Sequence, residues 1–150
     1  MNRFFIFSLF LFISTTNADT IKSYMGIALQ IPQMEIKADP QAQAWARSAR
    51  HVLAITSESI AETLVQANET AARQGAPIFC MPAGVQLGAM NLNEIIQQTY
   101  KEMSTPQSEK DSLTVSQVAW MGVVKQFPCK AATAAQQEMA LINNAWNGKS

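Results

Sequence analysis

The chain has 150 residues, with 11 Lys and Arg against 11 Asp and Glu, one His and two Cys. This length suits one domain with a real hydrophobic core. The balanced charge excludes the basic face that nucleic acid requires, and it gives no electrostatic reason for binding anionic lipid.

The first 18 residues have the pattern of a secretory signal. Arg3 gives a positive start, and Phe4 to Ser14 is an apolar run too short for a stable membrane anchor. Thr16 and Ala18 then occupy the small-residue positions of a cleavage site. The alternatives are a buried core helix or an uncleaved anchor. We expect cleavage after Ala18, export to the periplasm in a bacterium, and a mature domain of residues 19–150 that is not bound to the membrane.

Helical patterns fill the first half of the mature chain. Thr20 to Ile36 predicts one short helix, although Gly26 and Pro32 interrupt its apolar pattern. Asp39 followed by Pro40 predicts the start of a helix that runs to Ile55. Its apolar face carries Trp45, Ala49, Val52 and Leu53. Because Thr56 and Ser57 are good cap residues, we expect a second helix from there to Ala71, before Gly75 and Pro77.

Three further helices are predicted in the second half. Asn91 with Glu94 resembles a capping box and starts a helix that ends before Pro106. Its apolar face carries Ile95, Ile96, Tyr100 and Met103. A polar connection, Ser104 to Asp111, leads to a helix from Asp111 or Ser112 through Phe127, which is apolar nearly all round and should be the most buried. Ala131 to Trp146 is the fifth clear helical segment, counted without the interrupted pattern of Thr20 to Ile36, and has Ala135, Met139, Ile142 and Trp146 on one face. The sequence therefore predicts an all-α, single-domain bundle of about five helices.

The two cysteines, Cys80 and Cys129, allow three interpretations. A catalytic thiolate needs a nearby base, and the single histidine, His51, lies within a predicted amphipathic helix. A metal site needs three or four suitably spaced ligands, which two cysteines and one distant histidine do not provide. In an oxidising compartment, a Cys80–Cys129 disulfide is the simplest expectation.

Other enzyme signatures are missing from the sequence. The segment around Gly84 and Gly88 does not contain the lysine of a phosphate-binding loop, and no serine lies in a G-x-S-x-G pattern. Glu58, Glu62 and Glu69 share a helical face with basic and amide side chains, which indicates a solvated surface more than an acid/base pair. We therefore expect no catalytic residue, no metal and no cofactor.

Two stretches carry a family resemblance. FCMPAGVQLG, at residues 79–88, and the later FPC, at residues 127–129, together resemble the Rap/Tai family of immunity proteins, in which C-x-P-x-G-V-x-x-G precedes a helix and F-P-C closes the motif. The match covers about 50 residues. The chain is most similar to the periplasmic immunity proteins against type VI secreted peptidoglycan amidases of the fourth group. Cys80, Pro82, Gly84 and Cys129 are read as structural, the glycines permitting turns that other residues resist.

The resemblance implies a small helical homodimer that occludes the active site of a cognate amidase effector, so that two chains and two toxins assemble as a heterotetramer. The counterpart of the loop that enters the enzyme is Ser104 to Asp111, whose polar side chains suit a catalytic cleft. A plain solvated connection is the alternative. The expected toxin-binding residues are Gln97, Gln98, Lys101, Glu102, Ser104, Gln107, Ser108, Glu109 and Lys110.

A different class of function fits the same size and disulfide. The chain could be a small periplasmic chaperone or stress-binding protein, which would expose apolar surface on acidification. One histidine and eleven acidic groups provide only ordinary sensitivity to pH. The immunity protein is therefore the first hypothesis and the chaperone is its rival.

Overall fold

The structure, a computed structural model, describes residues 20–129. It contains five helices in this range: α1 (Ile21–Glu35), α2 (Pro40–Arg73), α3 (Ala89–Glu102), α4 (Gln107–Ser112) and α5 (Val115–Gln126). Between residues 20 and 129 the only β pairing is an isolated bridge of Thr20 with Thr114. The all-α, single-domain fold class is confirmed. The predicted signal segment and the predicted helix at 131–146 lie outside the described residues.

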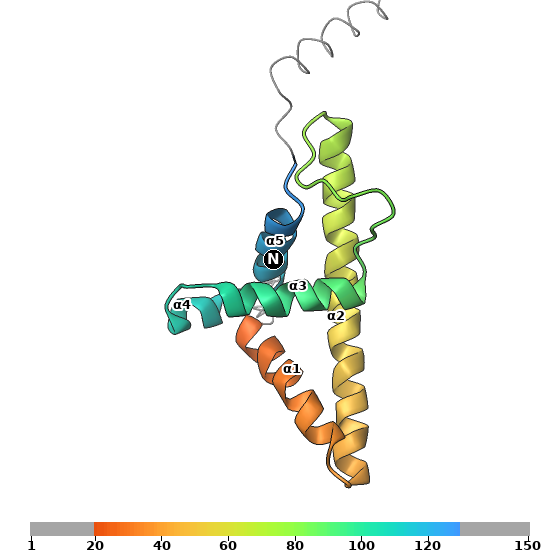
Figure 1. The fold of residues 1–150 in the computed structure, drawn as a ribbon, viewed down its shortest axis with the longest axis vertical. Helices are drawn as coiled ribbons and strands as arrows, with labels where there is room; N and C mark the ends of the chain where they lie inside the picture. Colours follow the sequence, from red (N-terminus) through yellow and green to blue (C-terminus); the bar gives the residue numbers. More distant parts are fainter. Residues whose placement is uncertain (1–19, 130–150) are drawn as a thin grey trace, which may run out of the picture.

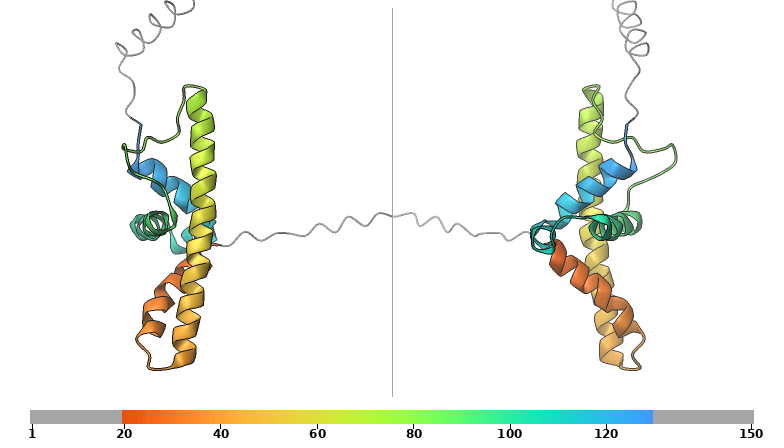
Figure 2. Two further views of the ribbon diagram at one scale, coloured as in Figure 1. Left: turned by 90° about the vertical axis from the view of Figure 1, so that its right-hand side faces the viewer. Right: turned by 60° about the vertical axis from the view of Figure 1, so that its left-hand side comes forward.

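The long helix α2 is the spine of the fold (Figure 1). α1 packs against the N-terminal half of α2, and α3 crosses α2. α5 packs against α3, on the same side of α3 as the C-terminal half of α2, and the turned views in Figure 2 agree. Buried side chains from α1, α2, α3 and α5 meet in one core, including Ile21, Leu53, Leu92, Ile96 and Val118. α4 lies at the end of α3 that points away from α2.

The prediction of two helices between residues 40 and 71 is wrong, because α2 is continuous. Asp39 caps it as expected, accepting hydrogen bonds from the backbone N–H groups of Gln41 and Ala42. Its buried stripe runs without a break through Ala42, Ala46, Ala49, Leu53, Ser57, Ala61 and Leu64. Trp45 and Val52, expected on this apolar face, are instead 37% and 51% exposed.

The helix predicted from Asn91 begins two residues earlier. Gly88 precedes its first turn, and the Asn91 side chain accepts a hydrogen bond from the Gly88 N–H at 2.7 Å, so Asn91 caps from inside the helix. Glu58 of α2 also accepts from the Ala89 N–H at 2.7 Å. The predicted apolar face holds: Ile95 and Ile96 are buried, and Tyr100 and Met103 pack against the core.

Two boundaries near the polar connection were also mispredicted. Residues 107–112 form the short helix α4, so Ser104 to Asp111 is only partly a loop. α5 begins after Thr114, whose side chain accepts from the Gln117 N–H at 3.2 Å, and not at Asp111 or Ser112. One face of α5 is buried, but Trp120 and Met121 on the other are each 39% exposed, so α5 is not buried all round.

The disulfide prediction is confirmed. Cys80 and Cys129 are joined, with 4.8 Å between their Cα atoms, and the Cys80 N–H donates to the Phe127 carbonyl at 2.8 Å. Gly84 has a positive φ of 82° in the turn that the Val85 N–H closes onto the Pro82 carbonyl. Gly88 is extended, at φ −129°, a conformation open to any residue, so the expectation for that glycine is wrong.

Candidate binding surface at the α3–α4 corner

The predicted binding residues gather around the end of α3 and the short α4. We name residues 97–111 the α3–α4 corner. The two helices meet at the end of the molecule farthest from α2 (Figure 1). Most of the predicted side chains are exposed: Gln98, Lys101, Glu102, Ser104, Gln107, Ser108 and Glu109. The corner therefore presents a mixed polar surface, beneath which Tyr100 and Met103 pack against the core.

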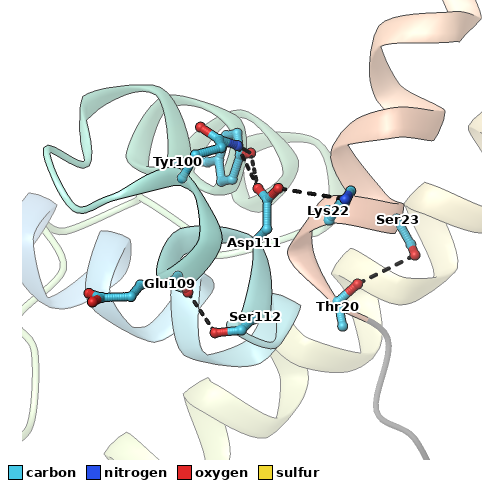
Figure 3. A network of polar contacts seen from close by, with 8 residues as sticks. Thr20, Lys22, Ser23, Tyr100, Glu109, Asp111 and Ser112 are labelled. Carbon is cyan, nitrogen blue, oxygen red and sulfur yellow. Dashed lines mark hydrogen bonds and ion pairs between the residues drawn. The ribbon is translucent and has the colours of Figure 1, made fainter.

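A hydrogen-bond network holds α4 against α3. The Tyr100 hydroxyl donates to Asp111 Oδ1 at 2.6 Å, and Gln107 Nε2 donates to the Tyr100 hydroxyl at 2.7 Å and to Asp111 Oδ1 at 2.6 Å. Figure 3 shows Asp111 between this group and Lys22 of α1, whose Nζ lies 3.9 Å from Asp111 Oδ2. Because a six-residue helix is not stable alone, these contacts fix the position of α4.

Lys110 packs over the aromatic ring of the same network. Its Nζ lies 4.4 Å from the centroid of the Tyr100 ring and 3.4 Å from the Met103 carbonyl, to which it donates. Hydrogen bonding to Asp111 raises the pKa of Tyr100, so its hydroxyl keeps its proton well into the alkaline range. The Tyr100 hydroxyl therefore stays a hydrogen-bond donor in the corner at neutral pH.

The predicted α3 residues divide between two sides of the helix. Gln98 donates to Glu102 Oε1 and Lys125 of α5 to Glu102 Oε2, both at 2.8 Å, along a groove between α3 and α5. These bonds, led by the one from Lys125, lower the pKa of Glu102. Gln97 lies on the other side, half-buried, and donates to Asn93 at 3.1 Å. The α3 residues therefore do not form one contact face.

Gln97 instead lines a cleft of about 630 Å³ between α1, α2 and α3. Its walls are mainly apolar, from residues such as Ile31, Leu53 and Met90, with Arg50 and Glu94 among the charged groups. Arg50 pairs with Glu35. The cleft is separate from the α3–α4 corner and shares only Gln97 with it.

Ser108 and Glu109 are free predicted contacts on α4, as Lys101 and Ser104 are beside it. Both are exposed on α4, and no hydrogen bond within residues 20–129 uses either side chain. Ser112 donates to the backbone carbonyl of Glu109 at 2.7 Å, and the Glu109 carboxylate points away from Tyr100 and Asp111 (Figure 3). Side chains on a held backbone that do not bond internally are the ones available to a partner.

Sequence reasoning missed Tyr100 and Lys22 as parts of this surface, and it placed Asp111 in the predicted binding loop without naming it as a contact. Tyr100 was assigned only to the apolar face of α3, and Asp111 only to a loop end or helix start. The separation of four residues between Gln107 and Asp111 was the available signal, because such pairs face each other on a helix. Nothing in the sequence indicated that Lys22, nearly ninety positions earlier, lies beside Asp111.

The described part of the chain contains no arrangement typical of catalysis. His51 is exposed on α2, and both cysteines are in the disulfide. Within residues 20–129, no group of three or more His, Cys, Asp or Glu side chains could hold a metal ion. No helix in this range combines the length and apolar character needed to cross a membrane.

The class defined by these observations is a single-domain, disulfide-bonded, all-α protein with a projecting polar corner. Comparison with protein-family models, with curated proteins and with solved structures found no match.

Proposed function

We propose that the protein is a periplasmic immunity protein that binds a type VI secreted peptidoglycan amidase and blocks its active site with the α3–α4 corner. The observation that carries this proposal is the fixed, projecting α4, which offers exposed polar side chains on a backbone held by Tyr100 and Asp111. A pre-organised projection loses less conformational entropy on binding than a flexible loop would. Resemblance to the Rap/Tai motif supplies the class of partner.

The proposed mechanism is inhibition by occlusion, and the protein itself is not an enzyme. Ser108 and Glu109 enter the amidase cleft, and Lys101 and Ser104 contact its rim. These side chains fill the cleft, so they keep out both the substrate and the water that the amidase needs for hydrolysis. The Cys80–Cys129 bond supports a periplasmic location, because disulfides persist in oxidising compartments.

The inhibitor acts as a homodimer in this proposal, so two chains and two amidases form a heterotetramer. An apolar stripe on the outer face of α2 supports self-association: Trp45, Val52 and Ile55 are 37%, 51% and 54% exposed. A twofold dimer requires a surface that meets itself, and a straight helix with an apolar stripe can provide one. Sedimentation of the chain alone should give the mass of two copies.

The test uses a Cys/His-containing amidase encoded by a neighbouring reading frame. We expect the exported protein to abolish peptidoglycan hydrolysis near equimolar ratio and to co-elute with the amidase in size-exclusion chromatography. Ser108→Arg with Glu109→Arg should weaken inhibition by at least tenfold, about 1.4 kcal/mol. A control with a similar gain of positive charge, Glu62→Arg with Glu69→Arg on the exposed face of α2, should inhibit normally.

Two outcomes would contradict the proposal. Absence of a complex with the amidase would remove the partner, and unchanged inhibition by the Ser108/Glu109 variant would place the contact surface elsewhere. The rival function, a periplasmic chaperone, is tested in parallel by protection of unfolded proteins from aggregation at low pH. Such protection without amidase inhibition would favour the chaperone.

A further inference from the structure

Helix α5 has two apolar faces, and the core uses one of them. The inner face contains Val115, Val118, Ala119, Gly122 and Val123, all buried. On the opposite side, Trp120, Met121 and Val124 share one face of the helix and form what we name the outer stripe.

Solvent reaches the outer stripe in the part of the chain that the structure describes. Trp120 and Met121 are each 39% exposed, and together with Leu113, Ser116 and Gln117 they line a shallow hollow of about 490 Å³. An apolar stripe beside a hollow, on a helix whose other face is already buried, is typical of a surface that another element covers.

The chain itself supplies a suitable element directly after α5. Cys129 follows the last residue of α5 by three positions and is held by its bond to Cys80, so residues 130–150 must start at this end of the helix. These residues lie outside the described part of the structure. Their sequence predicts an amphipathic helix at 131–146, with Ala135, Met139, Ile142 and Trp146 on one face.

The dimensions of this segment match the outer stripe. A 16-residue helix is about 24 Å long, and the 12 residues of α5 span about 18 Å at the same rise per residue. The four residues 127–130 are a usual length for the loop of an αα-hairpin. A helix that returns antiparallel to α5 can therefore run past the whole stripe.

The apolar character of the two faces also matches. The predicted face at 135, 139, 142 and 146 is apolar, and the outer stripe is the apolar surface nearest to the start of this segment. We propose that residues 131–146 fold back as a helix onto the outer face of α5 and cover Trp120 and Met121.

The test follows the solvent exposure of Trp120. In the exported chain with Trp45→Phe and Trp146→Phe, Trp120 is the only tryptophan left, and acrylamide quenching of its fluorescence reports its exposure. Met139→Glu with Ile142→Glu should raise the quenching constant about threefold and shift the emission to the red. Gln137→Glu with Asn144→Glu adds the same charge on the opposite face and should change neither.

A chain that ends at Lys130 provides a second variant and should expose Trp120 as strongly as the two Glu substitutions. Equal quenching in the full chain, the Met139/Ile142 variant and the shortened chain would overturn the proposal. The low quenching of the full chain should also persist over a hundredfold dilution. Protection of Trp120 that is lost on dilution would overturn the proposal in favour of a second copy as the covering partner.

Discussion

The hydroxyl groups of Tyr24 and Ser57 lie 2.8 Å apart in the core, although 33 positions separate the two residues. The Tyr24 hydroxyl also donates to Asn93 Oδ1 at 2.6 Å, so Ser57 donates to Tyr24. One phenol thus joins α1, α2 and α3. Burial raises the pKa of Tyr24, which keeps the hydroxyl protonated and able to donate.

Removal of the Tyr24 hydroxyl should destabilise the fold. Tyr24→Phe keeps the buried ring but leaves the Ser57 hydroxyl without its partner and removes one of the two hydrogen bonds to Asn93 Oδ1. We expect the free energy of unfolding to fall by about 1–3 kcal/mol. Urea unfolding of Tyr24→Phe, Ser57→Ala and the double variant measures the coupling. If the two single effects simply add, the proposed contribution of this hydrogen bond is refuted.

This contact explains why part of the fold escaped prediction. Thr56 and Ser57 favour helix caps by local chemistry, so the sequence predicted a break there. In the fold Ser57 is fully buried, and its hydroxyl is satisfied by Tyr24, so the helix continues. By contrast, Asp39 with Pro40 acts locally, and the start of α2 was predicted correctly.

The candidate site, like the fold, was predicted only where local sequence patterns determine it. The sequence indicated the polar region between α3 and α5 but did not predict α4, because its six residues, QSEKDS, have no apolar face. Contacts from Tyr100 and Lys22 hold α4 in place, and the second of these residues is distant in the sequence. Local patterns could locate the surface, whereas its rigidity depends on tertiary contacts.

Close packing between α3 and α5 predicts an effect of adding one methyl group. A Cβ at Gly122 would lie 2.3 Å from Thr99 Oγ1 and 2.5 Å from Ile95 Cγ2. Gly122→Ala should therefore lower the free energy of unfolding by about 1–3 kcal/mol despite the better helix propensity of alanine. Thermal unfolding followed by circular dichroism measures this loss.

Gly26 of α1 provides the matched control for Gly122. Its added Cβ would meet nothing within 4 Å. Gly26→Ala should stabilise the protein by about 0.5–1 kcal/mol, because alanine loses less backbone entropy in a helix. Equal effects of the two alanines would contradict the close approach of α3 and α5.

The disulfide should contribute mainly to stability. Cys80 and Cys129 are 49 positions apart, and closing a loop of this size stabilises the fold by about 4 kcal/mol in the chain-entropy model. Cys80→Ser with Cys129→Ser should lower the urea midpoint accordingly, and the reduced parent protein should match it. If the oxidised parent and the double variant unfold at the same midpoint, the bond does not constrain the unfolded chain.

The Tyr100–Asp111 contact predicts how the α3–α4 corner responds to alkaline pH. The pKa of Tyr100 is raised above its ordinary value of 10.0, first through the hydrogen bond to Asp111. The folded state therefore holds this proton more tightly than the unfolded state. The contribution to stability is complete below pH 10.0 and is lost as the pH rises through the higher pKa of the folded state.

The chain has two tyrosines, so Tyr24→Phe leaves Tyr100 as the only phenol to titrate. In that background, absorbance of the phenolate gives the pKa of Tyr100 directly. Asp111→Asn should lower this pKa toward its ordinary value, because the carboxylate that holds the proton is gone. Glu109→Gln is the matched control: it removes a nearby carboxylate that makes no hydrogen bond with Tyr100, and it should leave the pKa in place. If Asp111→Asn and Glu109→Gln shift the pKa equally, general charge and not the Tyr100–Asp111 hydrogen bond determines the titration of the corner.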